Sequence, residues 1–301
     1  MWLQTSPSSG PIPAAIRRCS VRVVSDNYPM RPPLNKDTRL CISLAARPSN
    51  IGTRFHNYLY EQLGLDFIYK AFTTTDIVAA IGGVRALGIR GCSVSMPFKE
   101  DVIALVDEVE PSAAAIHSVN TIVNDDGHLT ASNTDYIAVQ RLIEAHGLDP
   151  AAPILIRGSG GMANAVGAAF SDNGFRNGTI VARNRATGEA LANRLGYDYA
   201  PDVGSRTAAV IVNVTPLGMA GGPEEDLSAF DASTIAKAHT VFDVVALPSE
   251  TPLIAAARTA GVEVITGAEV IALQAAEQFE RYTGVRPTAE QVAAASAISR
   301  A

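Results

Sequence analysis

ILIRGSGGMANAVGAAF, residues 154–170, is the stretch of sequence that decides the fold. In it Gly158, Gly160 and Ala163 fill the pattern G-x-G-x-x-G/A between an expected strand and an expected helix. The first glycine permits a tight turn, the second lets the backbone approach a pyrophosphate, and the third position lets the helix pack closely on the strand. We expect a dinucleotide-binding loop, with an ordinary glycine-rich turn as the alternative. The other residues of the expected loop are Ser159, Gly161 and Met162.

The next expected strand indicates which dinucleotide the loop would hold. Where an NAD enzyme has an acidic residue for the ribose 2′-hydroxyl, this chain has Asn184 and Arg185. An arginine at this position can pair with a 2′-phosphate, which favours NADP over NAD. Glu189 weakens this preference, because it would repel that phosphate. The alternative for the neighbouring Arg183 is a solvated surface charge with no role in binding.

Outward from this loop, short apolar runs alternate with segments of helical period, which is typical of βαβ units and a parallel sheet. The pattern predicts strands at 40–45, 66–72, 91–95, 153–157, 178–182, 208–213, 241–245 and 262–264. It predicts helices at 53–63, 75–87, 133–146, 161–173, 187–195, 267–282 and 288–300. Asp126 and Gly127 lie between alternating runs and predict a hairpin over 121–132.

The chain has 301 residues, a length that usually divides into two domains. We expect an α/β fold with an interdomain cleft: a catalytic domain of residues 31–134 that the helices of 267–301 rejoin, and a Rossmann-type nucleotide domain of residues 150–266. Residues 1–30 are rich in Ser, Pro and Arg and lack the apolar core of a secretory signal. They are expected to be a disordered tail, or an over-long reading frame with Met30 as the true start.

Composition excludes several classes of protein. The net charge of −6 and the lack of a lysine-rich run argue against a nucleic-acid partner. No run reaches the roughly 18 apolar residues of a membrane span. The three cysteines, Cys19, Cys41 and Cys92, are too scattered for a disulfide framework or a zinc site, so we expect a cytoplasmic protein without a metal. Composition does not decide the oligomeric state, so a monomer and a homodimer are both kept as alternatives.

A second group of polar residues lies in the first half of the chain. Lys99 follows Pro97 and Phe98 directly after an expected strand, and Asp135 begins an expected helix. Both side chains are expected to point off the end of the sheet. A structural ion pair is the alternative to a catalytic pair.

Several segments together resemble the shikimate dehydrogenase family. GCSVSMPFKE is similar to its G-x-N-V-T-x-P-F-K motif, SVNTI to S-x-N-T, and SNTDY to x-N-T-D. In the second half, GSGGMA is similar to its glycine loop, NRA to N-R-T, NVTPLGM to N-x-T-P-x-G-M, and GAEVIALQAAEQFE to its G-x-x-M-L-x-x-Q-A-x-x-x-F helix. The order and spacing of these segments cover roughly residues 38–285, a far more specific match than any single motif.

The resemblance implies hydride transfer between NADP and a ring hydroxyl of shikimate, giving 3-dehydroshikimate, a step of aromatic amino acid biosynthesis. It places Lys99 and Asp135 at the reacting hydroxyl, where a base and a stabilising charge lower the barrier. Lys99 is favoured as the proton acceptor, although such a pair acts as a coupled unit. It further implies that Ser95, Asn120 and Gln274 bind substrate hydroxyls, and that Thr215, Val244 and Gly267 line the nicotinamide end.

The chain departs from the family where the substrate carboxylate is bound. The family motif S-x-S-P-x-x-H-N, aligned on His56 and Asn57, puts Asn50 and Gly52 at the two serines. Ser93 replaces the asparagine before V-T-x-P-F-K, Ser95 its threonine, and Ala246 a tyrosine. SLAARPSNIGTRFHN is instead very similar to a segment of the shikimate dehydrogenase-like subgroup. In it Arg47 either binds the carboxylate or is a surface arginine.

The leading hypothesis is an NADP-dependent oxidoreductase that acts on shikimate or a closely related hydroxylated ring carboxylate. Two alternatives stay open. One is a quinate or shikimate dehydrogenase that uses NAD. The other is a weakly catalytic dinucleotide-binding sensor, which the altered carboxylate site suggests.

Overall fold

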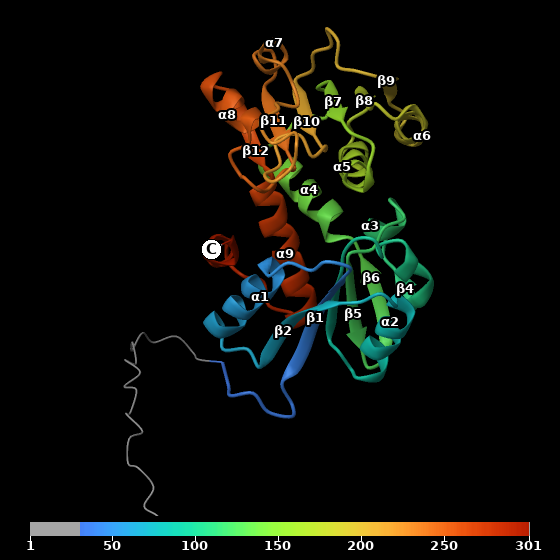
Figure 1. Ribbon diagram of the computed structural model, residues 1–301, viewed down its shortest axis with the longest axis vertical. Coiled ribbons are helices and arrows are strands. Elements are labelled where there is room, and N and C mark those ends of the chain that lie inside the picture. The colour runs from blue at the N-terminus through green and yellow to red at the C-terminus, as the bar shows by residue number, and fades with distance from the viewer. Residues whose placement is uncertain (1–30, 301) are drawn as a thin grey trace, which may run out of the picture.

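The computed structural model describes residues 31–300, which form two sheets stacked along the long axis of the molecule (Figure 1). The first sheet takes its strands from residues 39–132 and the second from residues 154–266. The expected α/β architecture is therefore confirmed. The domain boundaries near residues 134 and 150 stay a prediction, and the expected tail 1–30 lies outside the described residues.

The first sheet has six strands in the order β2 (Phe67–Thr73), β1 (Arg39–Ala45), β3 (Gly91–Val94), β5 (Thr121–Asp125), β6 (His128–Ser132) and β4 (Glu108–Val109). Only β5 runs against the others, because β3 and β6 both pair with it antiparallel. The expected hairpin is confirmed: it joins β5 to β6 through Asp126 and Gly127, both of which have positive φ. The short strand β4 had no counterpart in the sequence prediction.

Helices cover the first sheet: α1 (Ile51–Gln62), α2 (Ile77–Ala86), the 3-10 helix η1 (Asp101–Leu105) and α3 (Pro111–Ala114). The helix expected at 75–87 is present as α2, and the Asp76 side chain caps it by accepting a hydrogen bond from the backbone N–H of Ala79. The N-cap residue of α1, Asn50, makes no such bond with its side chain. The first turn of α1 is thus left without a side-chain cap.

The second sheet is entirely parallel, in the order β12 (Glu263–Thr266), β11 (Thr240–Asp243), β10 (Val210–Asn213), β7 (Ile154–Arg157), β8 (Gly178–Val181) and β9 (Asp198–Ala200). The strands on either side of β7 follow the arrangement of a Rossmann fold, in which the chain first builds one side of the sheet and then the other. The strand order reverses between β7 and β10. Ligands of open parallel sheets bind at the carboxyl ends of the two strands at such a point.

The helices of this half are α5 (Gly161–Asp172), α6 (Arg185–Leu195), α7 (Ala232–Ile235) and α8 (Pro252–Thr259). The expected helices at α5 and α6 are confirmed. No predicted helix corresponds to α7 or α8, although α8 carries start signals. The Thr251 hydroxyl accepts from the backbone N–H of Ile254, and Pro252 occupies the first turn.

Two helices carry the chain between the halves. The helix α4 (Thr134–Ala145) leads from the first sheet to the second, and α9 (Gly267–Thr283) leads back beside it (Figure 1). Arg141 of α4 pairs with Glu277 of α9, with 2.6 Å between Nη2 and Oε1. Thr266 and Glu269 form a capping box at the start of α9. The last helix, α10 (Ala289–Arg300), packs against α1 of the first half.

An aromatic cluster fills the space between α1, the first sheet and α9. The His56 ring lies at its centre, stacked on Tyr69 with 4.4 Å between ring centroids and on Phe279 with 6.0 Å. The ring is fully buried, and neither nitrogen has a hydrogen-bond partner among the described residues. Burial lowers the pKa of His56 to about 3, so the imidazole is neutral at neutral pH. Across residues 31–300, no helix is both long and apolar enough for a membrane span.

Candidate active site

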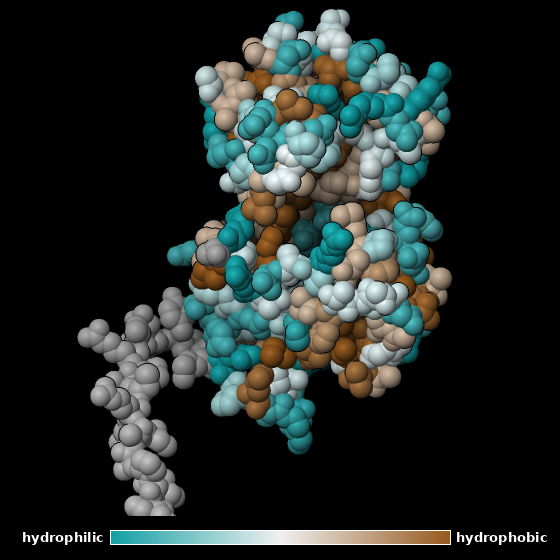
Figure 2. Space-filling view, in the orientation of Figure 1, coloured by the Kyte–Doolittle hydropathy of each residue, from teal (hydrophilic) through white to brown (hydrophobic). Residues whose placement is uncertain are grey.

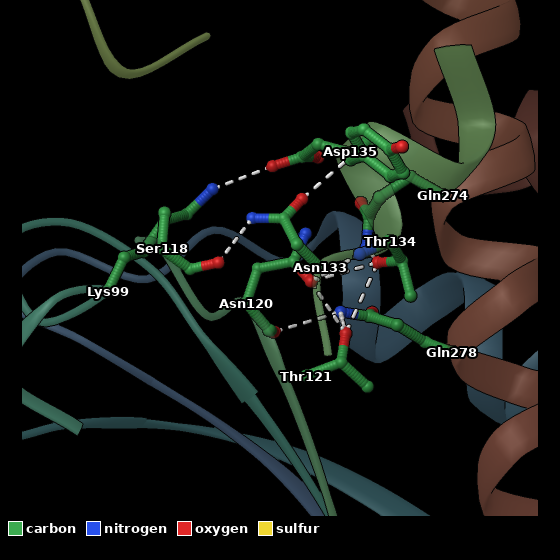
Figure 3. Close-up of polar contacts among 10 residues, drawn as sticks. Lys99, Ser118, Asn120, Thr121, Asn133, Thr134, Asp135, Gln274 and Gln278 are labelled. Carbon is green, nitrogen blue, oxygen red and sulfur yellow. Dashed lines mark hydrogen bonds and ion pairs between the residues drawn. The ribbon is translucent and has the colours of Figure 1, made fainter. Parts of the chain in front are cut away.

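Lys99 and Asp135 come from two different segments of the first half and form an ion pair. Lys99 follows β3 and precedes η1, whereas Asp135 lies in the first turn of α4. Their side chains approach to 2.7 Å between Nζ and Oδ2, and Figure 3 shows them facing each other. Both keep partial contact with solvent, with exposed fractions of 29% and 19%. The pair is thus available to a ligand.

The position of Asp135 is set by the capped start of α4. The Asn133 side-chain oxygen accepts from the backbone N–H of Tyr136 at 3.0 Å, and its amide nitrogen donates to the Ser118 carbonyl at 2.9 Å (Figure 3). Asn133 therefore ties the N-terminus of α4 to the loop before β5. This fixes the direction in which Asp135 leaves the helix.

Beneath the pair lies a buried hydrogen-bond network between β5, α4 and α9 (Figure 3). The Asn120 side-chain oxygen accepts from the backbone N–H of Thr134 at 2.8 Å and from the Thr121 hydroxyl at 2.8 Å. Gln274 Nε2 donates to the Thr134 hydroxyl at 3.1 Å, and Gln278 Nε2 donates to the Thr121 hydroxyl at 2.9 Å. The network brings Asn120 and Gln274 together, as the resemblance requires, and adds Gln278, which the sequence analysis did not identify.

The remaining expected substrate residues lie at the surface of the first half. Ser95 is exposed directly after β3, and Asn50 is exposed at the start of α1. Arg47 is exposed in the loop from β1 to α1 and makes no ion pair with any of residues 31–300. Figure 2 shows the surface hollowed between the two halves of the molecule.

A cavity of about 620 Å³ lies at the point where the strand order of the second sheet reverses. Gly158 has a φ of +129°, and a Cβ there would lie 2.9 Å from the Val214 carbonyl oxygen, so only glycine fits. Gly160 and Gly161 instead have open space within 4 Å, the room that a pyrophosphate needs. Of the expected cofactor residues, the cavity is lined by Gly158, Ser159, Gly160, Asn184 and Thr215.

The two arginines that flank Asn184 in the chain, Arg183 and Arg185, are each paired with an acid. Arg185 Nε donates to Glu189 Oε1 at 2.9 Å, while the arginine side chain is 80% exposed. Asn184 uses its side-chain oxygen to cap α6, accepting from the backbone N–H of Thr187. Arg183 lies 3.9 Å from Glu224 across the cavity. Arg185 can bind a 2′-phosphate with its full guanidinium only if it leaves Glu189.

The expected nicotinamide end is built on a buried carboxylate. Asp243 accepts from the Asn213 amide at 2.9 Å, from the Thr251 hydroxyl at 2.6 Å and from the backbone N–H of Val245 at 3.0 Å. Asn213 in turn accepts from the Thr215 hydroxyl at 2.6 Å. Burial raises the pKa of Asp243, against the effect of these donors.

Gly267 begins α9 against the loop that follows β11. A Cβ on Gly267 would lie 2.4 Å from the Val244 carbonyl oxygen, so the helix and the loop touch through their backbones. Gly267 thus sets the position of Val244, but neither residue lines the cavity described above. Met162, Ala163, Gly161 and Arg185 do not line it either.

Sequence reasoning missed residues that no local motif marks. Arg157 lines the nucleotide cavity, and burial next to Arg183 lowers the pKa of its guanidinium. Its guanidinium donates to the Ala229 carbonyl. The only available signal was the end position of Arg157 on the strand before the glycine loop. Within residues 31–300, no three His, Cys, Asp or Glu side chains are close enough together to hold a metal ion.

Comparison with known proteins assigns the family. The profile of the shikimate dehydrogenase substrate binding domain matches residues 50–122. A shikimate dehydrogenase-like protein of Haemophilus influenzae is 57% identical over 267 residues, which cover 89% of this chain and 98% of that protein. A shikimate dehydrogenase (NADP(+)) of Moorella thermoacetica is 36% identical over 246 residues, which cover 76% of this chain and 82% of that enzyme.

Solved structures agree over most of the chain. A shikimate 5-dehydrogenase-like protein superposes with a TM-score of 0.88 at 57% identity, covering 89% of this chain and 100% of that one. Shikimate 5-dehydrogenase of Thermus thermophilus, in complex with NADP(H) and shikimate, gives a TM-score of 0.78 at 27% identity over 87% of this chain and 99% of that one. Quinate dehydrogenase of Corynebacterium glutamicum, in complex with NAD, gives 0.79 at 27% identity over 87% and 98%. The chain therefore belongs to the shikimate dehydrogenase family of oxidoreductases.

Proposed function

We propose that this protein interconverts shikimate and 3-dehydroshikimate, or a closely related pair of hydroxylated ring carboxylates, with NADP as the hydride partner. The observation that carries the proposal is the 2.7 Å contact between Lys99 Nζ and Asp135 Oδ2. Both side chains keep solvent contact, with exposed fractions of 29% and 19%, so a ligand can reach them.

The pair is suited to moving the proton of a ring hydroxyl. As hydride leaves the ring carbon, the hydroxyl on that carbon must give up its proton. Lys99 Nζ, as the uncharged amine, accepts that proton with its lone pair, and a hydrogen bond to Asp135 Oδ2 holds the nitrogen in place. The charge of the resulting ammonium stabilises the oxygen during the transfer. Because the two groups share one contact, they act as a unit.

The nucleotide cavity supports the cofactor half of the proposal. Open space at Gly160 and Gly161 leaves the backbone N–H groups at the start of α5 accessible to a pyrophosphate. When bound, NADP supplies the acceptor for the hydride. Arg185 binds the 2′-phosphate after its hydrogen bond to Glu189 breaks. The Moorella relative is named for NADP, and the Corynebacterium structure holds NAD, so NAD is the alternative.

The substrate carboxylate would meet an altered surface. Asn50 offers an amide that is not used as a helix cap, and Gly52 offers no side chain. Arg47 lies three residues before Asn50 on an exposed loop, where its guanidinium can approach an anion. Ser95, Asn120 and Gln274 are left for the ring hydroxyls.

The test is an absorbance assay of NADPH formation with the purified protein. We expect turnover with shikimate and NADP, and slower turnover with NAD at the same concentration. An absence of turnover with shikimate and with quinate, on either cofactor, would refute the proposed substrate class. Faster turnover of quinate with NAD would favour the alternative instead. The variant Arg185→Ala should lose the preference for NADP while it keeps turnover with NAD.

The altered carboxylate site favours one further candidate, a dinucleotide-binding sensor with little catalysis. Neither Asn50 nor Gly52 has a hydroxyl to offer. Calorimetry separates the two functions. Tight binding of NADP without turnover on any cyclic hydroxy acid supports the sensor, and measurable turnover removes its basis.

A further inference from the structure

Gln278 is a buried side chain of α9 that the proposed proton transfer does not use. It is only 4% exposed. The helix motif that this segment resembles, G-x-x-M-L-x-x-Q-A-x-x-x-F, specifies the residue at Gln274 and leaves position 278 open. The two glutamines are four positions apart, so they lie on the same face of α9. Both reach the hydrogen-bond network at the start of α4 (Figure 3).

The Gln278 amide donates two hydrogen bonds into this network. Its Nε2 donates to the backbone carbonyl of Asn120 at 3.2 Å and to the Thr121 hydroxyl at 2.9 Å. A carbonyl oxygen only accepts, so the amide atom that faces it must be the nitrogen. The Thr121 hydroxyl has a single proton, and this proton points away from the donating nitrogen. Gln278 thus sets the direction in which the Thr121 hydroxyl donates.

The side-chain oxygen of Asn120 receives that proton. It lies 2.8 Å from the Thr121 hydroxyl, closer than the 3.2 Å between the hydroxyls of Thr121 and Thr134. The same oxygen accepts from the backbone N–H of Thr134 at 2.8 Å and from the Thr134 hydroxyl at 3.1 Å. A backbone N–H only donates, so the Asn120 atom that faces it must be the oxygen. Three donors to one oxygen leave the Asn120 amide a single orientation.

The nitrogen of the Asn120 amide therefore points the other way. Asn120 is 3% exposed, and its Nδ2 is not one of the enclosed side-chain atoms that lack a partner within residues 31–300. It also donates to none of those residues, so Nδ2 keeps contact with solvent. Figure 3 shows Asn120 below the contact between Lys99 and Asp135. The free donor of Asn120 is thus available to a ligand.

We propose that Gln278 is a positioning residue, which acts through Thr121 to hold the Asn120 amide with Nδ2 toward the substrate. This inference rests on the proposed function, because Asn120 is left there for a ring hydroxyl. The subsite then offers only a donor, so the ring oxygen that it binds must accept, as a hydroxyl or a ketone does. An ammonium group in place of that hydroxyl has no acceptor and would be rejected.

The experiment is a double-variant cycle on the kinetics with shikimate and NADP. Gln278→Met keeps the length of the side chain but cannot donate, and Asn120→Ala removes the amide that is positioned. We expect each single variant to raise KM for shikimate by about tenfold, with kcat largely kept. The double variant should have a KM within about twofold of that of Asn120→Ala, because no amide is left to position. Effects that instead multiply to about 100-fold would mean that Gln278 acts elsewhere, and the inference would be wrong.

A second pair of variants covers the case in which Gln278→Met fails to fold. Thr121→Val removes the hydroxyl between Gln278 and Asn120 without changing α9, whereas Thr121→Ser keeps that hydroxyl. Thr121→Val should raise KM as Gln278→Met does, and Thr121→Ser should keep the value of the wild type. Equal KM values for the valine and serine variants would overturn the inference.

The matched control is Gln140→Met. Gln140 lies on α4, and its Nε2 donates to the Tyr136 hydroxyl at 2.8 Å, outside the network around Asn120. The same substitution at this position should leave KM for shikimate unchanged. An equal rise of KM in Gln140→Met and Gln278→Met would show a general effect of losing a glutamine, and the specific role of Gln278 would be refuted.

Calorimetric binding of shikimate decides the inference if the wild type proves inactive. The proposed function then fails on turnover, while the positioning role is judged on affinity alone. About tenfold weaker binding by Gln278→Met, with no further loss when it is added to Asn120→Ala, would support the role. Binding by Gln278→Met equal to that of the wild type, or no binding by the wild type, would overturn it.

Discussion

At the scale of single residues, Lys99 and Asp135 form the contact on which the proposed proton transfer depends. They lie 36 positions apart in the chain, yet Nζ and Oδ2 are 2.7 Å apart. The buried network of Asn120, Thr134 and Gln274 fixes the start of α4 below them. A surface ion pair would contribute little to stability, so replacing either partner is a test of function more than of folding.

We therefore predict a large loss of turnover on Lys99→Ala or Asp135→Asn. The expected decrease in kcat is about 10²- to 10⁴-fold, because proton transfer by a positioned side chain contributes that much. Binding of NADP, measured by calorimetry, should stay unchanged, since neither residue lines the nucleotide cavity. Unchanged turnover of Lys99→Ala in an active preparation would contradict the mechanism.

His56 predicts a pH dependence of stability. An unfolded histidine has a pKa near about 6.5, and burial lowers the pKa of His56 to about 3. Between these values the unfolded chain binds a proton that the folded one excludes. The free energy of unfolding should therefore fall as the pH is lowered from about 6.5 to about 3, by up to about 1.4 kcal/mol per pH unit.

The variant His56→Phe should lose this part of the pH dependence. Phenylalanine preserves an aromatic ring against Tyr69 and has no proton to gain. Urea unfolding at pH 7 and at pH 5 measures the difference, with the wild type losing more stability than the variant between the two. Parallel losses in both proteins would show that His56 is not the group responsible.

At the scale of elements, the glycine loop between β7 and α5 combines two different requirements. Gly158 is needed by the protein, because of its φ of +129° and its contact with Val214. Gly160 is needed only by a ligand, because its surroundings are open. The motif alone does not separate these two roles, whereas the space around each glycine does.

Alanine at each position should thus give opposite results. Gly158→Ala should lower the free energy of unfolding by about 2 kcal/mol or more, through backbone strain and contact with Val214. Gly160→Ala should unfold close to the wild type but bind NADP much more weakly. Thermal unfolding and calorimetry measure the two effects, and a Gly158→Ala protein as stable as the wild type would be contrary to expectation.

The contact between α4 and α9 depends on an ion pair that is largely enclosed. Glu277 is 6% exposed, burial raises its pKa, and Arg141 opposes that shift. Arg141→Ala should lower stability by about 2 kcal/mol near neutral pH, because it leaves the carboxylate unpaired. Since the raised pKa of Glu277 favours its protonated form in the folded state, the loss should shrink as the pH falls toward about 4.3, the usual pKa of a glutamate.

The double variant Arg141→Leu, Glu277→Leu is the control for this pair. Replacing both charges by apolar side chains should restore most of the lost stability. Urea unfolding of the wild type, the single variant and the double variant measures the recovery. Equal losses in both variants would mean that packing by Arg141 matters more than its charge.

At the scale of the whole molecule, the sequence predicts what is local and misses what depends on strand order. Five of the six strands of the second sheet and the glycine loop follow from patterns within a few residues, whereas β9 was not predicted. The reversed strand β5 and the pairing of Ser43 with Ser93 do not follow from such patterns, because register is decided between segments far apart in the chain.

The residues of the candidate site likewise fall into those that local motifs predict and those that they do not. Lys99, Asp135, Asn120 and Gln274 belong to recognisable motifs, and the structure brings them together. Gln278 and Arg157 belong to no recognised motif, although Gln278 joins the network below Asp135 and Arg157 lines the nucleotide cavity. Their positions depend on packing between segments far apart in the chain, which no pattern in a single sequence encodes.

The helix α9 contacts both the expected nicotinamide end of the nucleotide half and the hydrogen-bond network below Asp135. Its first residue, Gly267, lies against Val244, and Gln274 and Gln278 reach the network below Asp135. Its 17 residues span about 25 Å, so this one helix fixes the distance between its contacts in the two halves. One residue inserted between Gly267 and Gln274 would rotate the rest of the helix by about 100° and carry Gln274 away from the Thr134 hydroxyl. The spacing of these residues along α9 is therefore as much a part of the site as their identity.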